Sequence, residues 1–277
     1  MTEKITFIGG GNMAAALVGG LVASGVSPLD IGVVDLNPDQ LNRLADSYGV
    51  RTFTTAQPAV QNATVVVWAV KPQVLREAAE SISQIMSNVL HVSIAAGIRL
   101  QDLTRWLESD RVVRAMPNTA ALVGAGVTGL LAGTAVSAAD RHLTEQLLSA
   151  TGGTFWVDSD EDMNAVTAVS GSGPAYVFHF LEGFQVAAEQ VGFSSERARD
   201  LALQVVSGAV KQALQGGESF GELRQRVTSK RGTTEAALAV LERFSTQRAM
   251  IEAIQAACDR GRDLGTELGA DAVRSSL

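Results

Sequence analysis

The clearest indication of a chemical role in the sequence comes from a glycine-rich segment after its first apolar run. Gly9, Gly11 and Ala14 have the G-x-G-x-x-A spacing, between an expected strand and an expected helix. The first glycine permits a tight turn, the second lets a pyrophosphate approach the backbone, and the helix N-terminus attracts phosphate. The alternative is a tight turn without a ligand. The dinucleotide site predicted here comprises Ile8, Gly9, Gly10, Gly11, Asn12 and Met13.

Asp35, at the end of the second expected strand, is the next candidate cofactor residue. An acidic side chain here accepts hydrogen bonds from both ribose hydroxyls and repels a 2′-phosphate, which favours NADH over NADPH. The alternative is that Asp35, with Asn37 and Pro38, caps the following helix. The two roles are compatible.

Three further segments follow expected strands, so they should reach the edge where open α/β sheets bind ligands. Lys71 is one of only four lysines and can face cofactor phosphate or ribose; the alternative is a solvated lysine. Small residues in the later segments suit a nicotinamide that lies close to the backbone. The segments are Ala69, Val70, Lys71 and Pro72; Ala95, Ala96 and Gly97; and Met116, Pro117 and Asn118.

Two polar segments precede expected helices in the C-terminal part of the chain. Residues 170–174 form an expected loop with flexible backbone donors, and residues 227–234 supply amides and hydroxyls. Either can bind an anion such as a substrate carboxylate. The alternatives are a loop needed only to begin a helix in the first case, and a simple N-cap in the second.

The elements that position these residues follow from the hydrophobic pattern. Short β-branched runs alternate with helical stretches, which predicts an α/β fold with a Rossmann-type, doubly wound parallel sheet. Residues 65–70 are apolar throughout, as in a central strand that is covered on both faces. The expected strands are residues 5–8, 31–34, 64–70, 89–94, 112–115, 127–131 and 155–157.

The strand signal ends at the acidic run 158–162, which we interpret as a solvated hinge and the start of a helix. We therefore expect two domains, with residues 1–159 binding the dinucleotide and residues 160–277 forming an all-helical domain. Residues 175–188 are apolar almost all round, so this helix must be buried on every side. Because a small helical domain has little interior, we expect a second copy of the chain to cover the helix, in a homodimer or larger assembly.

Composition excludes several other classes of protein. Hydrophobic residues make up 46% and charged residues 18%, unlike a disordered chain, and the net charge of -7 disfavours nucleic acid and anionic membranes as partners. The single Cys258 cannot form an intrachain disulfide, and the three histidines lack metal-ligand spacing, so no metal is expected. Without a signal peptide or a membrane span, the expected location is cytoplasmic.

These segments, in this order, resemble pyrroline-5-carboxylate reductase over essentially the whole chain. The most specific marks are residues 170–176 and 227–234, whereas the glycine-rich segment is shared by many dehydrogenases. The resemblance implies reduction of the C=N bond of 1-pyrroline-5-carboxylate to L-proline by hydride from NAD(P)H, the last step of proline biosynthesis. It also implies a Rossmann domain followed by a helical dimerisation domain that interlocks with its partner, in relatives commonly assembled further into a ring of dimers.

The resemblance gives the two polar segments roles at the substrate. The backbone of residues 229–233 would hold the carboxylate, and the catalytic Thr234 would hydrogen-bond the pyrroline nitrogen, opposite a nicotinamide cradled by residues 95–97 and 116–118. A protonated C=N bond is already electrophilic, so Thr234 orients and polarises without acting as an acid. The substrate-binding residues would be Ser172, Gly173, Ser229, Lys230, Arg231, Gly232, Thr233 and Thr234.

The sequence departs from the family at two places. Asp35 stands where relatives tend to carry small polar or basic residues, so the cofactor is NADH or NADPH with a tilt toward NADH. Lys230 and Arg231 stand where the family usually has Pro and the first glycine of a pair, so a positive φ would strain Arg231. Arg231 would reshape the pocket mouth or add a cation for the carboxylate.

Two other functions remain as alternatives. A β-hydroxyacid dehydrogenase shares the two-domain layout but uses a catalytic lysine early in its helical part, and residues 160–180 contain no lysine. A non-catalytic dinucleotide-binding protein would keep the fold and lose turnover, with Arg231 as the lesion.

Overall fold

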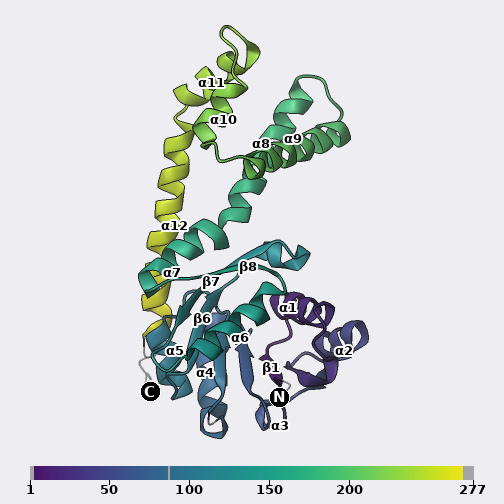
Figure 1. The fold of residues 1–277 in the computed structure, drawn as a ribbon, viewed down its shortest axis with the longest axis vertical. Coiled ribbons are helices and arrows are strands. Elements are labelled where there is room, and N and C mark those ends of the chain that lie inside the picture. Colours follow the sequence, from purple (N-terminus) through teal and green to yellow (C-terminus); the bar gives the residue numbers. More distant parts are fainter. Residues whose placement is uncertain (1–2, 87, 271–277) are drawn as a thin grey trace, which may run out of the picture. The chain divides into compact units, whose positions relative to one another are not determined.

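The structure is a computed structural model that describes residues 3–86 and 88–270. Its main feature is an eight-stranded sheet in the order β3-β2-β1-β4-β5-β6-β7-β8, with helices on both faces (Figure 1). The strands are β1 (Ile5–Ile8), β2 (Ile31–Val34), β3 (Arg51–Phe53), β4 (Val65–Trp68), β5 (Leu90–Ser93), β6 (Val112–Met116), β7 (Gly126–Ala132) and β8 (Gly152–Trp156).

The doubly wound sheet predicted from the sequence is confirmed, with two differences. The first six strands are parallel, but β7 is antiparallel to β6, and β8 is parallel to β7. A parallel return needs a crossover of about a dozen residues or more, and residues 117–125 hold only a 3₁₀ turn. The hydrophobic pattern also misses β3, because this short strand at the edge of the sheet has one large apolar side chain, Phe53.

Two separate cores hold the sheet between its helices. Every residue of β1, β2, β4 and β5 is buried, which explains why these strands are apolar at nearly every position. Leu17, Leu41 and Leu147 pack on one face, and Val60, Leu75 and Leu103 pack on the other. The helices of the first face are α1 (Asn12–Ala23), α2 (Pro38–Tyr48) and α6 (Ala138–Ser149), and those of the second are α3 (Ala56–Val60), α4 (Pro72–Ile82) and α5 (Leu100–Leu107).

The chain divides into two compact units. The sheet unit holds the described residues up to 172 together with those from 256 onward, and the helical unit holds residues 173–255. This division differs from the expected boundary between residues 159 and 160, because Met163 and Val166 of α7 (Asp160–Val166) pack against Leu131 in β7. The expected boundary, which marks the end of the strand signal, stays a prediction.

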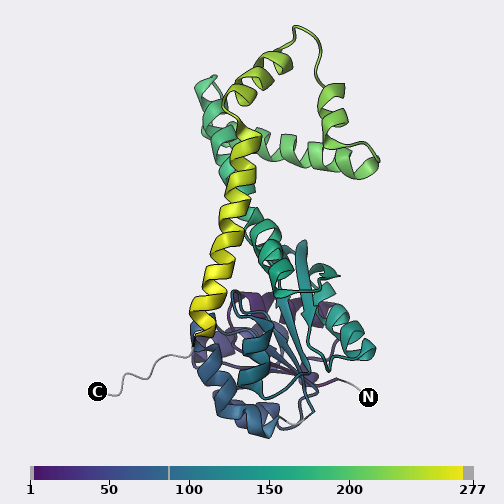
Figure 2. The same cartoon turned by 90° about the vertical axis from the view of Figure 1, so that its left-hand side faces the viewer.

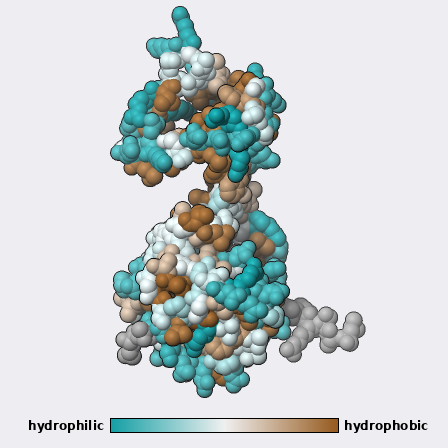
Figure 3. Space-filling view, turned by 90° about the vertical axis from the view of Figure 1, so that its right-hand side faces the viewer, coloured by the Kyte–Doolittle hydropathy of each residue, from teal (hydrophilic) through white to brown (hydrophobic). Residues whose placement is uncertain are grey.

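The helical unit leaves its most apolar helix uncovered. It contains α8 (Gly173–Gln190), α9 (Ser195–Gln215), α10 (Phe220–Arg226), α11 (Thr233–Arg243) and the first turns of α12 (Thr246–Gly269). No residue of α8 is buried in the single chain, and Phe178 is 65% and Phe180 55% exposed. Figure 3 shows brown, apolar side chains gathered on the surface of this unit. Exposed apolar surface of this kind is typical of an interface with another chain.

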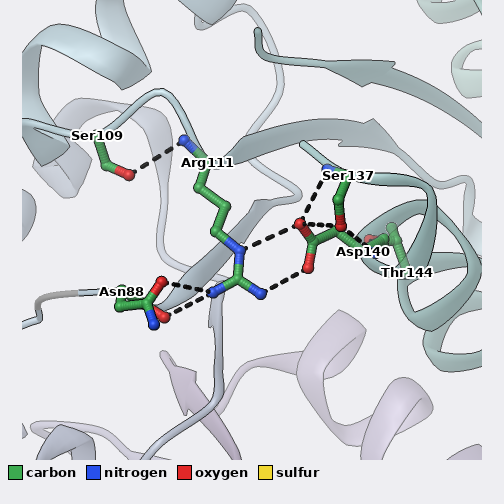
Figure 4. Close-up of polar contacts among 6 residues, drawn as sticks. All are labelled: Asn88, Ser109, Arg111, Ser137, Asp140 and Thr144. Atoms are coloured by element: carbon green, nitrogen blue, oxygen red, sulfur yellow. Dashed lines mark hydrogen bonds and ion pairs between the residues drawn. The ribbon is translucent and has the colours of Figure 1, made fainter. Parts of the chain in front are cut away.

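A polar cluster joins β6 to α6 (Figure 4). Arg111 donates to both carboxylate oxygens of Asp140, at 3.1 and 2.6 Å, and to the backbone oxygen of Asn88 at 2.6 Å. Asp140 also forms a capping box with Ser137 at the start of α6. The hydrogen bond from Arg111 is the main cause that lowers the pKa of Asp140 to about 2. The two-pronged Arg–Asp pair thus fixes the start of β6 against α6.

A buried histidine makes the sheet unit sensitive to acid. His91 of β5 is fully buried, and its Nδ1 accepts a hydrogen bond from Nε1 of Trp68 at 3.3 Å. Its Nε2 has no hydrogen-bond partner among the described residues. Burial, and then the charge of Arg111, lower the pKa of His91 to about 4, so the folded protein holds this side chain neutral at pH 7.

We predict a loss of stability between about pH 6.5 and pH 4. In this window the unfolded chain protonates His91 near its ordinary pKa of about 6.5, whereas the folded chain does not until about pH 4. Stability therefore falls as the pH falls. The urea midpoint should drop between pH 7 and pH 5, and the drop should be smaller in His91→Gln.

His142→Gln is the matched control, because His142 is exposed on α6, and it should follow the wild type. The same decline in all three proteins would show that other groups cause the acid sensitivity.

Candidate functional site

The glycine turn after β1 lies against the end of β4. Gly9 has a φ of +104°, and a Cβ at this residue would lie 2.6 Å from the carbonyl oxygen of Ala69. The amide of Gly9 donates to the oxygen of Val34 at 2.8 Å, and the amide of Ala69 donates to the oxygen of Ile8 at 2.8 Å. Only glycine fits here, and the turn brings the ends of three parallel strands together.

The start of α1 is open to a ligand. Gly11 is the N-cap of α1 and has no side chain to cap it, and no atom of the described chain lies within 4 Å of where its Cβ would be. The first hydrogen bond of the helix runs from the amide of Ala15 to the oxygen of Gly11, which leaves the earlier N–H groups without intrahelical partners. The arrangement suits an anionic group at this helix end.

Asp35 holds the glycine turn from the neighbouring strand. Its Oδ2 accepts from the amide of Gly10 at 2.7 Å, and its Oδ1 accepts from the amide of Asn37 at 2.8 Å. The cap of α2 is Asn37, whose side chain accepts from the amide of Asp39 at 3.0 Å. The side chain that caps α2 is therefore that of Asn37, and the Asp35 carboxylate lies beside the glycine turn.

The ends of β4 and β5 also reach this edge. Lys71 is exposed and serves as the N-cap of α4, which begins at Pro72 as expected. After β5, Ala95 is buried, Ala96 is exposed and Gly97 has a φ of +77°. Exposed backbone between two buried small residues is compatible with a flat ring lying against it.

The structure brings residues 116–118 together with residues 170–171. Asn118 is buried; its Nδ2 donates to the oxygen of Ser170 at 3.0 Å, and its Oδ1 accepts from the amide of Val127 at 3.2 Å. A Cβ on Gly171 would lie 2.8 Å from the Cε of Met116. Two segments that are distant in the sequence therefore share one polar and one close apolar contact.

The expected loop at residues 170–174 is wrong. Thr167–Gly171 forms a π-helical turn that joins α7 to α8, and the amide of Ser172 donates to the oxygen of Thr167 at 2.9 Å. The hydroxyls of Thr167 and Ser170 donate to carbonyl oxygens one turn earlier, which lets these polar residues stay in a helix. A π turn is rare and is often found at a functional site.

The second polar segment does form a turn between two helices. Arg231 has a φ of +58°, the left-handed conformation that would strain it, and its amide donates to the carboxylate of Glu235 at 2.6 Å. The amide of Gly232 donates to the oxygen of Ser229 at 3.1 Å. Gly232 is the N-cap of α11 without a side-chain cap, so the helix begins two residues before the expected Glu235. The next N–H groups, those of Thr233 and Thr234, have no intrahelical acceptor.

Sequence reasoning missed a buried ion pair in the sheet unit. Arg114 of β6 is 2% exposed and donates to Asp160 of α7 at 2.5 Å, and the same carboxylate accepts from the amide of Leu100 at 3.1 Å. Burial lowers the pKa of Arg114, and Asp160 opposes that effect. The expected solvated hinge is therefore wrong at Asp160, and no local pattern could have revealed a partner so distant in the sequence.

The expected cofactor residues belong to the sheet unit, and the expected residues Gly173 and 229–234 belong to the helical unit. Among the described residues, no group of three or more histidine, cysteine, aspartate or glutamate side chains could hold a metal ion. Within the same ranges, no helix is long and apolar enough to cross a membrane.

Comparisons with known proteins cover nearly the whole chain. The model described as pyrroline-5-carboxylate reductase dimerisation matches residues 160–264, and the model described as NADP oxidoreductase coenzyme F420-dependent matches residues 4–97. The pyrroline-5-carboxylate reductase of Pseudomonas aeruginosa is 42% identical over 97% of this chain and 99% of its own.

Two solved structures extend the similarity to the fold. A pyrroline-5-carboxylate reductase from Coxiella burnetii is 41% identical, with a TM-score of 0.90 over 95% of this chain and 99% of its own. The pyrroline carboxylate reductase of Plasmodium falciparum with NADP bound is 26% identical, with a TM-score of 0.86 over 95% of this chain and 98% of its own.

Proposed function

Because the chain belongs to the pyrroline-5-carboxylate reductase family, we propose which of its residues carry the reaction of that family. The protein reduces the C=N bond of 1-pyrroline-5-carboxylate to L-proline with NAD(P)H. The observation that carries this function is the match to reductases along almost the full length of both chains. The roles of individual residues are our proposals, which the geometry of each unit supports.

The sheet unit binds the dinucleotide at the edge where β1, β2 and β4 end. The free N–H groups at the start of α1 hold the pyrophosphate, and the open space beside Gly11 lets it approach. Lys71 contributes a cation at the same edge, and Asp35 faces the ribose. The proposed cofactor residues are Ile8, Gly9, Gly10, Gly11, Asn12, Met13, Asp35, Ala69, Val70, Lys71, Pro72, Ala95, Ala96, Gly97, Met116, Pro117 and Asn118.

The substrate carboxylate binds at the start of α11. The amides of Arg231 and Gly232 already have acceptors, which leaves those of Thr233 and Thr234, the Ser229 hydroxyl, and the cations of Lys230 and Arg231. Ser172 and Gly173, at the start of α8, complete the proposed substrate residues.

The chemistry then requires little from the protein. Bound NAD(P)H supplies a hydride, which forms a bond to the imine carbon while the C=N π electrons move to nitrogen. The nitrogen already carries its proton, which solvent supplies, so no side-chain acid is used. Thr234 orients the ring by a hydrogen bond at nitrogen, and its contribution is one of positioning.

We predict that Thr234→Ala lowers kcat/KM about ten- to a hundredfold, a loss of about 1.4 to 2.7 kcal/mol of transition-state binding. The hydroxyl at the start of α11 is removed while the backbone amides remain. Initial rates of NADH oxidation with pyrroline-5-carboxylate measure the effect. Thr234→Ser should recover most of the rate, and Thr246→Ala, at the exposed start of α12, should match the wild type. Full activity in Thr234→Ala would remove this residue from the mechanism.

We predict that Asp35→Ser raises the ratio of kcat/KM for NADPH to that for NADH about tenfold or more, equivalent to about 1.4 kcal/mol. The carboxylate that repels a 2′-phosphate is lost, together with an acceptor for the ribose hydroxyls. Asp46→Ser removes the same charge from an exposed position late in α2 and should leave the ratio unchanged. Equal ratios in wild type and Asp35→Ser would limit Asp35 to its bonds with Gly10 and Asn37.

The protein is a homo-oligomer, since its helical region matches a dimerisation family. The finer assembly we assign is a homodimer in which the partner covers α8, with a ring of dimers as the larger form. A groove of about 610 Å³ between α8 and α9, lined by Phe178, Leu181 and Leu203 among others, is the place for apolar side chains of the second copy.

A cytoplasmic location suits a chain whose only cysteine is free.

We predict that Phe178→Asp converts the oligomer to a monomer, because a charge would be buried at the interface. Sedimentation velocity measures the change. Leu29→Asp adds the same charge at a 70% exposed side chain of the sheet unit and should leave the oligomer intact. A Phe178→Asp protein of unchanged mass would place the interface elsewhere.

A further inference from the structure

The end of α12 carries glycines where a helix usually does not. Gly261, Gly265 and Gly269 recur every four residues, so they lie on one face, and the first two are the buried residues of this helix. Each internal glycine lowers helix stability by roughly 1 kcal/mol relative to alanine, which calls for a packing reason. The sheet unit supplies that reason, since residues 256–270 belong to it.

Gly265 contacts the loop between β5 and α5. A Cβ at Gly265 would lie 3.0 Å from the Nε of Arg99 and 3.6 Å from the carbonyl oxygen of Gly97. In return, a Cβ at Gly97 would lie 3.2 Å from Leu268 and 3.4 Å from Leu264. The helix and the loop therefore approach so closely that a Cβ on either glycine would press on a side chain of the other element.

Hydrogen bonds fasten the same contact. Arg99 donates from Nη2 to the hydroxyl of Thr266 at 2.5 Å, and Arg105 of α5 donates to the carbonyl oxygen of Gly269 at 3.0 Å. Figure 2 shows this end of α12, in yellow, against the sheet unit. Where α5 begins, the amide of Leu100 donates to Asp160, the partner of buried Arg114. The loop is thus held both by α12 and by α7.

We propose that the last turns of α12, through Gly265, position residues 95–97 against the nicotinamide of the cofactor. The proposal rests on the cofactor role given to these residues in the proposed function. Gly265 is a positioning residue, since it acts through the backbone of Gly97 and not by contact with the cofactor. Hydride transfer is sensitive to displacements of about 1 Å, so a loop pushed outward slows the reaction without removing any ligand group.

Gly265→Val tests the proposal. Its Cβ alone would lie 3.0 Å from the Nε of Arg99 and 3.6 Å from the oxygen of Gly97, and it carries two further methyl groups. We therefore expect kcat to fall about tenfold or more and the Kd for NADH to rise. The Kd for ADP-ribose, which lacks the nicotinamide, should stay within about twofold, because the turn at residues 9–11 is untouched. With NADH deuterated at the transferred position, the isotope effect on kcat should increase as hydride transfer becomes rate-limiting.

The control lies one turn earlier on the same face. A Cβ at Gly261 would meet only Asn164, at 3.5 Å or more, which is ordinary contact, so Gly261→Ala should match the wild type in all four measurements. If Gly265→Val does not fold, Gly265→Ala replaces it with a smaller expected effect, a fall in kcat of about two- to threefold, since it asks Arg99 to move by only a few tenths of an ångström.

Two results would overturn the proposal. One is an unchanged kcat in a folded Gly265 variant, and the other is an equal loss of affinity for NADH and ADP-ribose, which would show general damage to the sheet unit. A wild-type protein that binds NADH but does not oxidise it with pyrroline-5-carboxylate would instead contradict the proposed function.

Discussion

The contact of Gly9 with the carbonyl group of Ala69 is the constraint on which the cofactor site depends. Without a Cβ at residue 9, the turn after β1 passes directly over the end of β4, and Asp35 then holds Gly10 from the end of β2. Three strand ends and the start of α1 are thereby fixed at one edge. A larger residue would lift the turn and move the start of α1, so the same few atoms set both the strand packing and the geometry of the proposed cofactor site.

The hydrophobic pattern of the sequence predicts which strands are buried, but it does not predict whether a strand runs parallel or antiparallel to its neighbour. Strands such as β4 can be recognised because covered faces on both sides require apolar residues throughout. The reversal at β7 has no such signature, since hydrophobicity does not record which way a strand runs, and only the short link after β6 excludes a parallel return. The edge strand β3 was not predicted, because its side chains are too exposed to require a run of apolar residues.

Within the site, the residues that can be predicted are those whose backbone conformation requires a particular amino acid. Gly9 is found from local spacing, because the turn itself demands glycine. Asp160 and Gly265 could not be found this way, since Arg114 and Arg99, their partners, lie about 50 or more residues away in the sequence and only the fold brings them together. The π turn at Thr167–Gly171 could not be recognised from composition, because glycine and serine are typical of loops and the hydrogen bond from the Ser170 hydroxyl to the oxygen of Val166 is visible only in the fold.

The turn before α11 can keep its backbone conformation although Arg231 departs from the family pattern. A left-handed arginine is disfavoured by about 1 to 2 kcal/mol, yet Arg231 adopts this conformation, at a position where the resemblance to the family led us to expect glycine. Its amide donates to the Glu235 carboxylate at 2.6 Å, and this hydrogen bond opposes the strain. Because the compensation is local, the amides of Thr233 and Thr234 keep their place at the helix start. The substitution thus adds a cation to the turn without taking away the groups that the proposed substrate site uses.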